Sequence, residues 1–209
     1  VLAPKTPGEC FLAAFHAVRI ALEYMTPVVL LSDGYLGNGS EPWLLPDADA
    51  LPDIKVSFAA LETAALDDGA FLPYVRDPET LARGWATPGT AGLEHRIGGL
   101  EKDARTGGVR YDPENHQRMT ETRAEKVARI ADAFPDLEVE GDAEGDVLVV
   151  GWGSTYGALK KAVASARADG LAVGHVHLRW LNPLPPGLGG VLGRFEHVLV
   201  PELNGGQLV

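Results

Sequence analysis

Cysteine is almost absent from this sequence of 209 residues, which contains only Cys10. One thiol cannot form a disulfide within the chain, and it cannot by itself hold an iron–sulfur cluster or a structural zinc ion. We therefore expect a reduced, cytoplasmic protein. Basic residues are also few, because 18 Lys and Arg stand against 29 Asp and Glu, for a net charge of -11. An acidic surface of this kind repels phosphate backbones, so a nucleic acid is not an expected partner.

Long apolar runs are lacking as well. No stretch approaches the roughly 20 apolar residues that span a bilayer, which argues against a membrane partner. The first helical pattern is interrupted by charges, unlike a signal peptide. The composition, with 45% hydrophobic and 22% charged residues, is typical of a globular protein with a packed core. The chain begins at Val1 without Met and ends on Leu208 and Val209, so we expect a piece of a longer polypeptide.

The charges divide the chain into three zones. Residues 1–93 have a net charge of -7, residues 94–140 of -3 and residues 141–209 of -1. The middle zone has 19 charged residues among 47, and glycines at its start. This pattern predicts a charged connector between two better-packed regions.

The first zone has clear helix and strand signals. Residues 6–9, Thr-Pro-Gly-Glu, form a capping box that predicts a helix ending at Pro27. The apolar run 28–31 is typical of a strand buried on both faces, and its carboxyl end delivers Ser32 and Asp33. Ligands gather at such strand ends in open α/β sheets. Residues 54–58 predict a further short strand.

The remaining zones predict an α/β arrangement. Asp112 and Pro113 start a long, mostly charged helix that Pro135 closes. Residues 146–150, 172–178 and 197–200 predict strands, and residues 155–168 predict a helix that ends near Gly170. Strands alternating with helices indicate a parallel sheet covered by helices.

The turn at residues 151–157, Gly-Trp-Gly-Ser-Thr-Tyr-Gly, follows one of these strands and precedes a helix. Gly153, Ser154 and Thr155 are candidates for a phosphate-binding turn, because a helix N-terminus attracts anions. Tyr156 occupies the third glycine position of a dinucleotide fingerprint, and no acid ends the next strand. A tight strand–helix turn explains the glycines equally well, so NAD(P) binding is the weaker alternative.

Other isolated candidates have structural explanations. Asp33 is expected to cap a turn, because no nucleophile elbow surrounds Ser32. His175 and His177 alternate on a strand without a carboxylate or cysteine at metal-ligand spacing, so we expect satisfied or interfacial histidines and no metal site. Cys10 lies in a first helical turn, where the dipole lowers a thiol pKa, but such a small residue is expected to be buried.

Residues 92–101, Gly-Leu-Glu-His-Arg-Ile-Gly-Gly-Leu-Glu, form the most unusual string. Glu94, His95 and Arg96 place an acid, an imidazole and a guanidinium in a glycine-flanked loop. Ionisable groups concentrated in a loop with little apolar anchoring favour a functional site over a packing role.

This string belongs to an ordered set that resembles the alpha subunit of 2-oxoacid:ferredoxin oxidoreductases, and most closely the 2-oxoglutarate group. The resemblance covers essentially the whole chain, and its strings follow one another in the family's order. They are residues 27–43, 87–89, 92–101, 111–116, 151–158, 181–185 and 201–208.

The resemblance implies a fold and an activity. The expected fold is α/β, with the end of a transketolase-type pyrimidine domain followed by a transketolase C-terminal-like parallel domain. Residues 1–93 would close the thiamine-diphosphate domain, residues 94–140 would be the connector, and residues 141–209 the C-terminal domain. The implied reaction, in central carbon metabolism, oxidatively decarboxylates a 2-oxoacid with coenzyme A to an acyl-CoA, CO2 and reduced ferredoxin.

The resemblance also implies cofactors and partners. Thiamine diphosphate and Mg would bind between alpha and beta subunits of an α2β2 assembly, and a [4Fe-4S] cluster would lie on the beta subunit. Ferredoxin would be a partner of the complex. The catalytic residues would lie upstream of Val1, which leaves Glu94, His95, Arg96 and Asp33 as substrate or interface candidates here. A scaffold module of the same complex without chemistry of its own is the alternative function.

Overall fold

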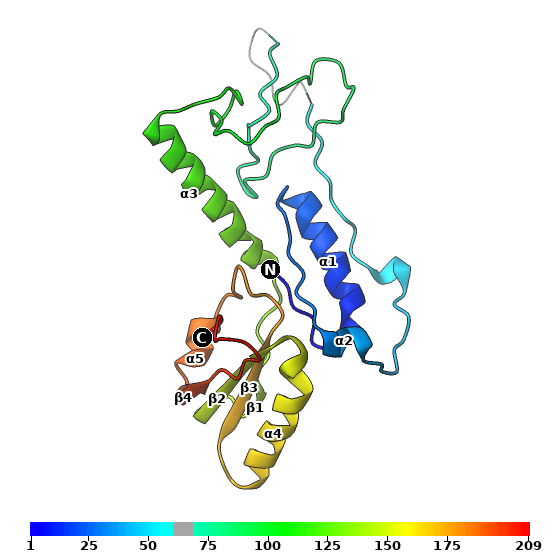
Figure 1. Cartoon of the computed structure of the whole chain (residues 1–209), viewed down its shortest axis with the longest axis vertical. Coiled ribbons are helices and arrows are strands. Elements are labelled where there is room, and N and C mark those ends of the chain that lie inside the picture. Colours follow the sequence, from blue (N-terminus) through cyan, green and yellow to red (C-terminus); the bar gives the residue numbers. More distant parts are fainter. Residues whose placement is uncertain (61–68) are drawn as a thin grey trace. The chain divides into compact units, whose positions relative to one another are not determined.

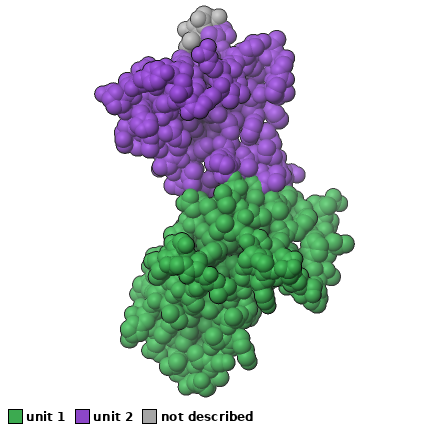
Figure 2. Space-filling model, viewed as in Figure 1, with its two compact units in different colours: residues 1–17, 28–51, 131–209 green, residues 18–27, 52–130 purple. Residues whose placement is uncertain are grey.

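The computed structural model describes residues 1–60 and 69–209, which form two compact units (Figure 2). Unit 1 comprises Val1–Ala17, Val28–Leu51 and Ala131–Val209, and unit 2 comprises Val18–Pro27 and Pro52–Ile130. Each unit is thus assembled from segments far apart in the sequence. Among the described residues, no helix is long and apolar enough to cross a membrane.

The helices and strands are few relative to the length of the chain (Figure 1). The described residues contain the α-helices α1 (Glu9–Glu23), α2 (Gly34–Asn38), α3 (Pro113–Arg129), α4 (Tyr156–Ala168) and α5 (Leu188–Leu192). The strands are β1 (Glu140–Gly141), β2 (Gly145–Trp152), β3 (Val173–Leu178) and β4 (Phe195–Leu199). Short 3-10 helices span Ala48–Ala50, Ile130–Ala133 and Gly153–Thr155.

The sheet of unit 1 has the order β1-β3-β2-β4. Strand β2 pairs in parallel with β3 and with β4, so the three strands expected from the sequence are confirmed as a parallel set. The two-residue strand β1 pairs antiparallel with β3, with Glu140 opposite His175. An antiparallel edge strand on an otherwise parallel sheet is common in α/β folds. The sheet is therefore mixed, whereas the sequence predicted a parallel one.

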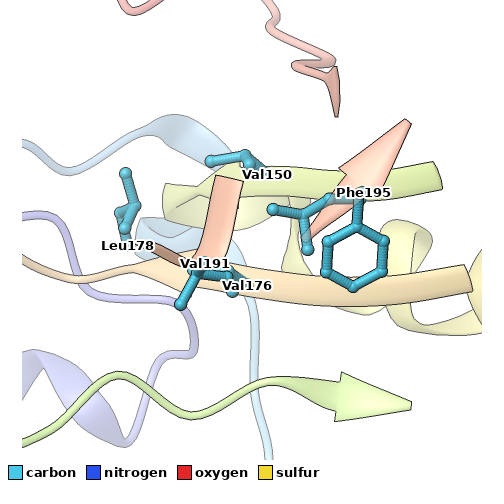
Figure 3. Close-up of a cluster of buried hydrophobic side chains, with 6 residues drawn as sticks. Val150, Val176, Leu178, Val191 and Phe195 are labelled. Carbon is cyan, nitrogen blue, oxygen red and sulfur yellow. The ribbon is translucent and has the colours of Figure 1, made fainter. Parts of the chain in front are cut away.

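Apolar side chains on one face of this sheet pack against α5, and those on the other face pack against α4. On one face, β2, β3, α5 and β4 contribute the buried cluster Leu148, Val150, Val176, Leu178, Val191 and Phe195 (Figure 3). On the other face, Val149 and Val173 pack against Val163 of α4. Alternation along β2 and β3 sends successive side chains to opposite faces, which places His175 and His177 on the face that α4 covers.

The helix ends follow the chemistry of their sequences. Asp112 caps α3 by accepting the N–H of Asn115 at 2.9 Å, and Pro113 opens that helix, both as predicted. In α1, the N–H of Glu9 donates to Thr6 Oγ1 at 3.3 Å, while the Glu9 carboxylate accepts the N–H of Lys5 at 2.7 Å. Gly170 follows the last residues of α4 with a φ of 92°, the left-handed conformation that ends helices.

The prediction of a fully buried strand at residues 28–31 was wrong. Leu30 forms only an isolated parallel bridge with Leu2, where the N–H of Leu31 donates to the carbonyl of Leu2 at 2.7 Å. The side chains of Val29 and Leu30 are 53% and 37% exposed. A strand is buried on both faces only when elements cover both, and the described residues supply one pairing segment.

Unit 2 consists mainly of loops anchored to α3 and to the end of α1. Asn115 of α3, which is buried, donates its side-chain amide to the carbonyl of Lys102 at 2.8 Å. The indole N–H of Trp85 donates to the carbonyl of Leu22 at 2.8 Å. The strand predicted at residues 54–58 is wrong, because only Phe58 forms an isolated bridge, with Trp85. Backbone groups in these loops are thus satisfied by individual bonds instead of a sheet.

Candidate functional site

Asp33 and Ser154, two candidates from separate motifs, meet in unit 1. Ser154 Oγ donates a hydrogen bond to Asp33 Oδ2, across 121 positions of sequence. The other carboxylate oxygen of Asp33 accepts the N–H of Leu36 at 3.0 Å and caps α2, which confirms the predicted capping role. Burial acts to raise the pKa of Asp33, but the hydrogen bonds from Ser154 and the backbone outweigh it and lower that pKa. Asp33 is therefore an ionised group held in place by two elements.

The turn between β2 and α4 is tightly closed. Gly153 has a φ of 61°, which favours glycine, and its carbonyl accepts a hydrogen bond from His177 Nε2 at 3.0 Å. Thr155 Oγ1 donates to the carbonyl of Trp152 at 2.7 Å. The hydroxyl protons of Ser154 and Thr155 are thus used within the chain. Phosphate binding at this turn stays a prediction that would depend on backbone N–H groups.

His175 and His177 lie within a polar cluster that the sequence motifs did not define. The Tyr156 ring lies 5.8 Å from the His175 ring and 5.0 Å from the His177 ring, between centroids. Tyr156 donates its hydroxyl to Glu140 at 2.8 Å, and the ammonium groups of Lys5 and Lys160 lie 4.3 and 5.3 Å from its ring centroid. We call these six residues the Tyr156 cluster.

The two histidines of the Tyr156 cluster are held in their neutral form. Burial lowers the pKa of His177 to about 4, and burial also lowers the pKa of His175 despite the nearby carboxylate of Glu140. His175 is 1% exposed, and within the described chain neither of its ring nitrogens has a hydrogen-bond partner. Of the two alternatives expected for this residue, satisfied or interfacial, the described chain does not supply the hydrogen bonds of the first, and the contacts of the His175 ring are with the rings of Tyr156 and His177. Residues 1–60 and 69–209 contain no group of three metal-ligating side chains.

Cys10 does not have the lowered pKa that its place in the first turn of α1 suggested. Burial raises the pKa of the Cys10 thiol, and the charge of Glu9 raises it further. Its Sγ contacts the carbonyl of Thr6 at 3.5 Å. A thiol held protonated in this way is a poor nucleophile. Cys10 is half-buried, so the expectation of a buried residue was wrong.

The loop that contains Glu94, His95 and Arg96 belongs to unit 2. Glu94 folds back to accept the N–H of Gly92 at 2.8 Å, and His95 Nδ1 lies 2.9 Å from the carbonyl of Leu93. The His95 ring packs edge-on against Phe71, with centroids 5.4 Å apart. Arg96 is exposed and has no ion pair among the residues that the structure describes. His95 is thus oriented by its surroundings, whereas Arg96 presents a free guanidinium.

The candidates therefore fall into two groups. Asp33, Ser154 and the turn at residues 151–157 come together in unit 1, next to the Tyr156 cluster, while residues 94–96 form a separate loop in unit 2. The sequence reasoning missed the roles of Lys5, Glu140 and Lys160. The useful signal was Tyr156 itself, whose side chain replaces the expected glycine and organises these three residues.

A mixed α/β sheet in unit 1 and a loop-rich unit 2 are consistent with the two family models that match the chain. The model for the thiamine-diphosphate-binding part of pyruvate flavodoxin/ferredoxin oxidoreductases matches residues 1–111. The model for core domain II of pyruvate:ferredoxin oxidoreductases matches residues 145–209. Both models describe parts of oxidoreductases that use flavodoxin or ferredoxin. The chain belongs to the pyruvate flavodoxin/ferredoxin oxidoreductase family, which confirms the fold class and the resemblance expected from the sequence.

Individual relatives narrow the similarity further. The 2-oxoglutarate oxidoreductase subunit KorA of Mycobacterium tuberculosis is 53% identical over the whole of this chain, which covers 31% of that protein. The 2-oxoglutarate synthase subunit KorA of Methanothermobacter marburgensis is 26% identical, with 99% of this chain and 53% of that protein covered. The chain therefore spans between about a third and a half of the length of these relatives.

A solved structure has the same fold. The 2-oxoglutarate:ferredoxin oxidoreductase from Magnetococcus marinus, described with 2-oxoglutarate, coenzyme A and succinyl-CoA bound, matches with a TM-score of 0.84 at 29% identity. The match covers 99% of this chain and 35% of that chain.

Proposed function

We propose that this chain forms part of the alpha subunit of a thiamine-diphosphate-dependent 2-oxoglutarate:ferredoxin oxidoreductase. The observation that carries the proposal is the 53% identity over the whole chain to the M. tuberculosis 2-oxoglutarate oxidoreductase subunit. The reaction would convert 2-oxoglutarate and coenzyme A into succinyl-CoA and CO2 and pass two electrons to ferredoxin. We propose 2-oxoglutarate as the 2-oxoacid substrate, because the M. tuberculosis and Methanothermobacter relatives are named as subunits of 2-oxoglutarate enzymes.

The composition of this chain limits which cofactors of the complex it could hold by itself. The chain has one cysteine, so it cannot supply the four thiolates of a [4Fe-4S] cluster. As the resemblance implies, Mg would likewise be held outside this chain. We place both on the beta subunit, with thiamine diphosphate bound between that subunit and this one. When bound, thiamine diphosphate supplies the carbanion-stabilising chemistry that decarboxylation of a 2-oxoacid requires.

The proposed assembly is an α2β2 complex in the cytoplasm that docks ferredoxin through its beta subunits. The thiamine-diphosphate-binding family model matches residues 1–111, which supports a place near the cofactor for some of these residues. Copurification of the intact alpha subunit with its beta partner is the direct test. The proposal requires a stoichiometric complex, and a monomeric alpha subunit in the presence of the beta chain would contradict it.

Within this function, we assign Arg96 to a carboxylate of the substrate or of the beta subunit. Its exposed guanidinium has no ion pair in the described chain, and a guanidinium binds carboxylates in a bidentate manner. The neighbouring His95 is fixed by Phe71 and by the carbonyl of Leu93, so it would present its remaining ring nitrogen in a defined direction.

The test compares Arg96→Ala with Arg105→Gln, which removes an exposed charge elsewhere in unit 2. Loss of a bidentate contact predicts a rise of about tenfold or more in KM for 2-oxoglutarate, or loss of the alpha–beta complex. Arg105→Gln should leave both unchanged. Unaltered kinetics with an intact complex in Arg96→Ala would contradict the assignment.

A non-catalytic scaffold role is supported by one observation, namely that the hydroxyls of Ser154 and Thr155 are used within the chain. The scaffold function predicts that Arg96→Ala, Ser154→Ala and Asp33→Asn each alter assembly or stability while kcat and KM of the assembled enzyme remain as in the wild type. A change in kinetic constants in a fully assembled variant would exclude it. The NAD(P)-binding alternative finds no support in the family matches.

A further inference from the structure

Unit 2 contains a pocket of about 360 Å³ whose lining is strongly cationic. Five basic side chains line it, together with a single carboxylate, Glu101, and the backbone of Gly98 and Gly99. The basic side chains come from three separate stretches of sequence, and they are Arg76, Arg83, Lys102, Arg123 and Lys126. This concentration of positive charge contrasts with the net charge of -11 for the whole chain.

Most of these cations lack an anionic partner. Arg123 alone forms an ion pair within the described residues, with its Nη atoms 3.2 and 3.3 Å from the two oxygens of Glu101. Lys126 and Lys102, which are 9% and 2% exposed, donate only to backbone carbonyls. Positive charge is therefore buried here without charge neutralisation.

The two remaining arginines show the same shortage of partners. Arg76 Nη1 donates to the carbonyl of Leu81 at 2.8 Å, while its buried Nε has no hydrogen-bond partner in the described chain. Arg83 Nη1 donates to the carbonyl of Pro73 at 3.2 Å, and its guanidinium lies 4.4 Å from the Tyr74 ring centroid. Several guanidinium N–H groups are thus left for a ligand.

The charges around this pocket repel one another. Burial and the charges of Arg76, Arg83 and Arg123 lower the pKa of Lys126 to about 8, so its ammonium remains mostly protonated at pH 7. Burial and the charges of Arg83 and Arg123 lower the pKa of Arg76 as well. Burying charges without compensation is unfavourable, so a bound anion would stabilise this arrangement.

We propose that this pocket is a binding site for a phosphate group, either inorganic phosphate or the phosphate of a larger ligand. A phosphate monoester carries close to two negative charges and three acceptor oxygens, which suits several cations better than a single carboxylate does. Arginine forks bind such oxyanions in a bidentate manner, and the lysines add point charges. Because a water molecule occupies about 30 Å³, the pocket has room for a phosphate group and ordered water.

The proposal concerns binding alone and requires no turnover, so its failure would leave the function proposed above untouched. The direct test is calorimetric titration of the intact alpha subunit with inorganic phosphate at constant ionic strength. Glycerol 3-phosphate serves as a phosphate monoester, and malonate as a dicarboxylate of similar charge. Both phosphate compounds should bind more tightly than malonate. Tighter binding of inorganic phosphate than of the monoester would identify free phosphate as the ligand, and the reverse preference would identify the phosphate of a larger ligand.

Two variants locate the binding site. Lys126→Met and Arg83→Gln should each weaken phosphate binding about tenfold or more, whereas Arg105→Gln, which removes a charge outside the pocket, should not change it. In phosphate-free buffer, Lys126→Met should melt at the same temperature as the wild type or higher, because it relieves repulsion. The phosphate-induced rise in Tm should be reduced in this variant.

Three results would overturn the proposal. The first is no phosphate binding by the wild type at millimolar concentrations, and the second is malonate binding as tight as phosphate binding. The third is a Lys126→Met variant that melts lower than the wild type but keeps the full phosphate-induced rise in Tm. That last result would assign Lys126 the purely structural role of holding the carbonyl of Met25.

Discussion

Glu101 joins the loop of residues 92–101 to α3 through charged hydrogen bonds. Arg123 donates to both of its oxygens, and His116 Nδ1 lies 2.9 Å from one of them. The hydrogen bonds from Arg123 are the main cause that lowers the pKa of Glu101 from 4.5 to about 2, with burial opposing and His116 assisting. A carboxyl group whose pKa is lower in the folded chain than in the unfolded chain stabilises the fold when the pH is above its unfolded-state pKa. This stabilisation is lost as the pH falls through its folded-state pKa.

Replacing Glu101 with Gln should therefore lower the free energy of unfolding at pH 7 by about 2 kcal/mol. The difference between wild type and variant should shrink between pH 4.5 and pH 2, where the wild-type carboxylate becomes protonated. Urea unfolding at a series of pH values measures this difference in the free energy of unfolding. Glu121→Gln, at a carboxylate that accepts from the neutral Gln117 at 2.7 Å, is the control with a small effect. A pH-independent difference for Glu101→Gln would contradict this electrostatic account.

In unit 1, His177 is a second group whose lowered pKa makes the fold less stable in acid. Burial lowers its pKa from 6.5 to about 4, so the fold prefers the neutral ring, whose Nε2–H donates to the carbonyl of Gly153. The wild type should lose about 2–3 kcal/mol of stability as the pH falls from 6.5 to 4. His177→Gln keeps an amide donor without the titration, so its stability should fall less over this interval.

The control for His177 is His197→Gln, because His197 lies in β4 of the same sheet and is exposed. The pH dependence between 6.5 and 4 should remain largely as in the wild type in that variant. If His177→Gln shows the same loss of stability as the wild type over this interval, the neutral ring of His177 is not the cause.

At the scale of elements, Gly174 is the residue that sets how closely β3 packs against its neighbours. A Cβ at this position would lie 2.5 Å from the carbonyl oxygen of Asp142 and 2.6 Å from Cζ of Phe195. Gly174→Ala should therefore destabilise unit 1 by about 1–3 kcal/mol, because a backbone atom and a core ring must move.

Gly189 provides the matched control in α5. No atom lies within 4 Å of a Cβ added there, and alanine favours a helix over glycine by roughly 0.5–1 kcal/mol. Thermal or urea unfolding should show Gly189→Ala at wild-type stability or above. Equal stability of the two variants would mean that β3 is less tightly packed than these distances state.

Helix starts and the three parallel strands could be predicted because their signals are local. Asp112 and Pro113 fix the start of α3 by a hydrogen bond within three residues, and the continuous apolar run of residues 147–150 in β2 matches a strand whose two faces are both covered. The run 28–31 could not be assigned in the same way, because an apolar run indicates only that a segment can be buried. Whether it becomes a strand depends on neighbours that the run itself does not contain.

The candidate sites depended on contacts that no local pattern encodes. The bond between Ser154 and Asp33 joins positions 121 residues apart, so each was only a separate candidate in the sequence. The cationic pocket likewise combines Arg76, Arg83 and Lys126 from distant stretches. The sequence identified the loop of residues 92–101 through its composition, but the cations opposite that loop became apparent only in the folded chain.

At the scale of the whole molecule, the two units contain different candidate sites. Unit 1 contains the mixed sheet, the Asp33–Ser154 contact and the Tyr156 cluster, and unit 2 contains the His95 loop and the cationic pocket. The family models cover residues 1–111 and 145–209, so the matched regions include parts of both units. The proposed function therefore concerns segments of both units.

The most direct test of the proposed function is an anaerobic assay of the intact alpha–beta complex with 2-oxoglutarate, coenzyme A, thiamine diphosphate and oxidised ferredoxin. The account predicts one succinyl-CoA and one CO2 for every two ferredoxins reduced, with no reduction when 2-oxoglutarate, coenzyme A or thiamine diphosphate is omitted. A higher kcat/KM for pyruvate than for 2-oxoglutarate, or ferredoxin reduction that proceeds equally well without coenzyme A, would contradict it.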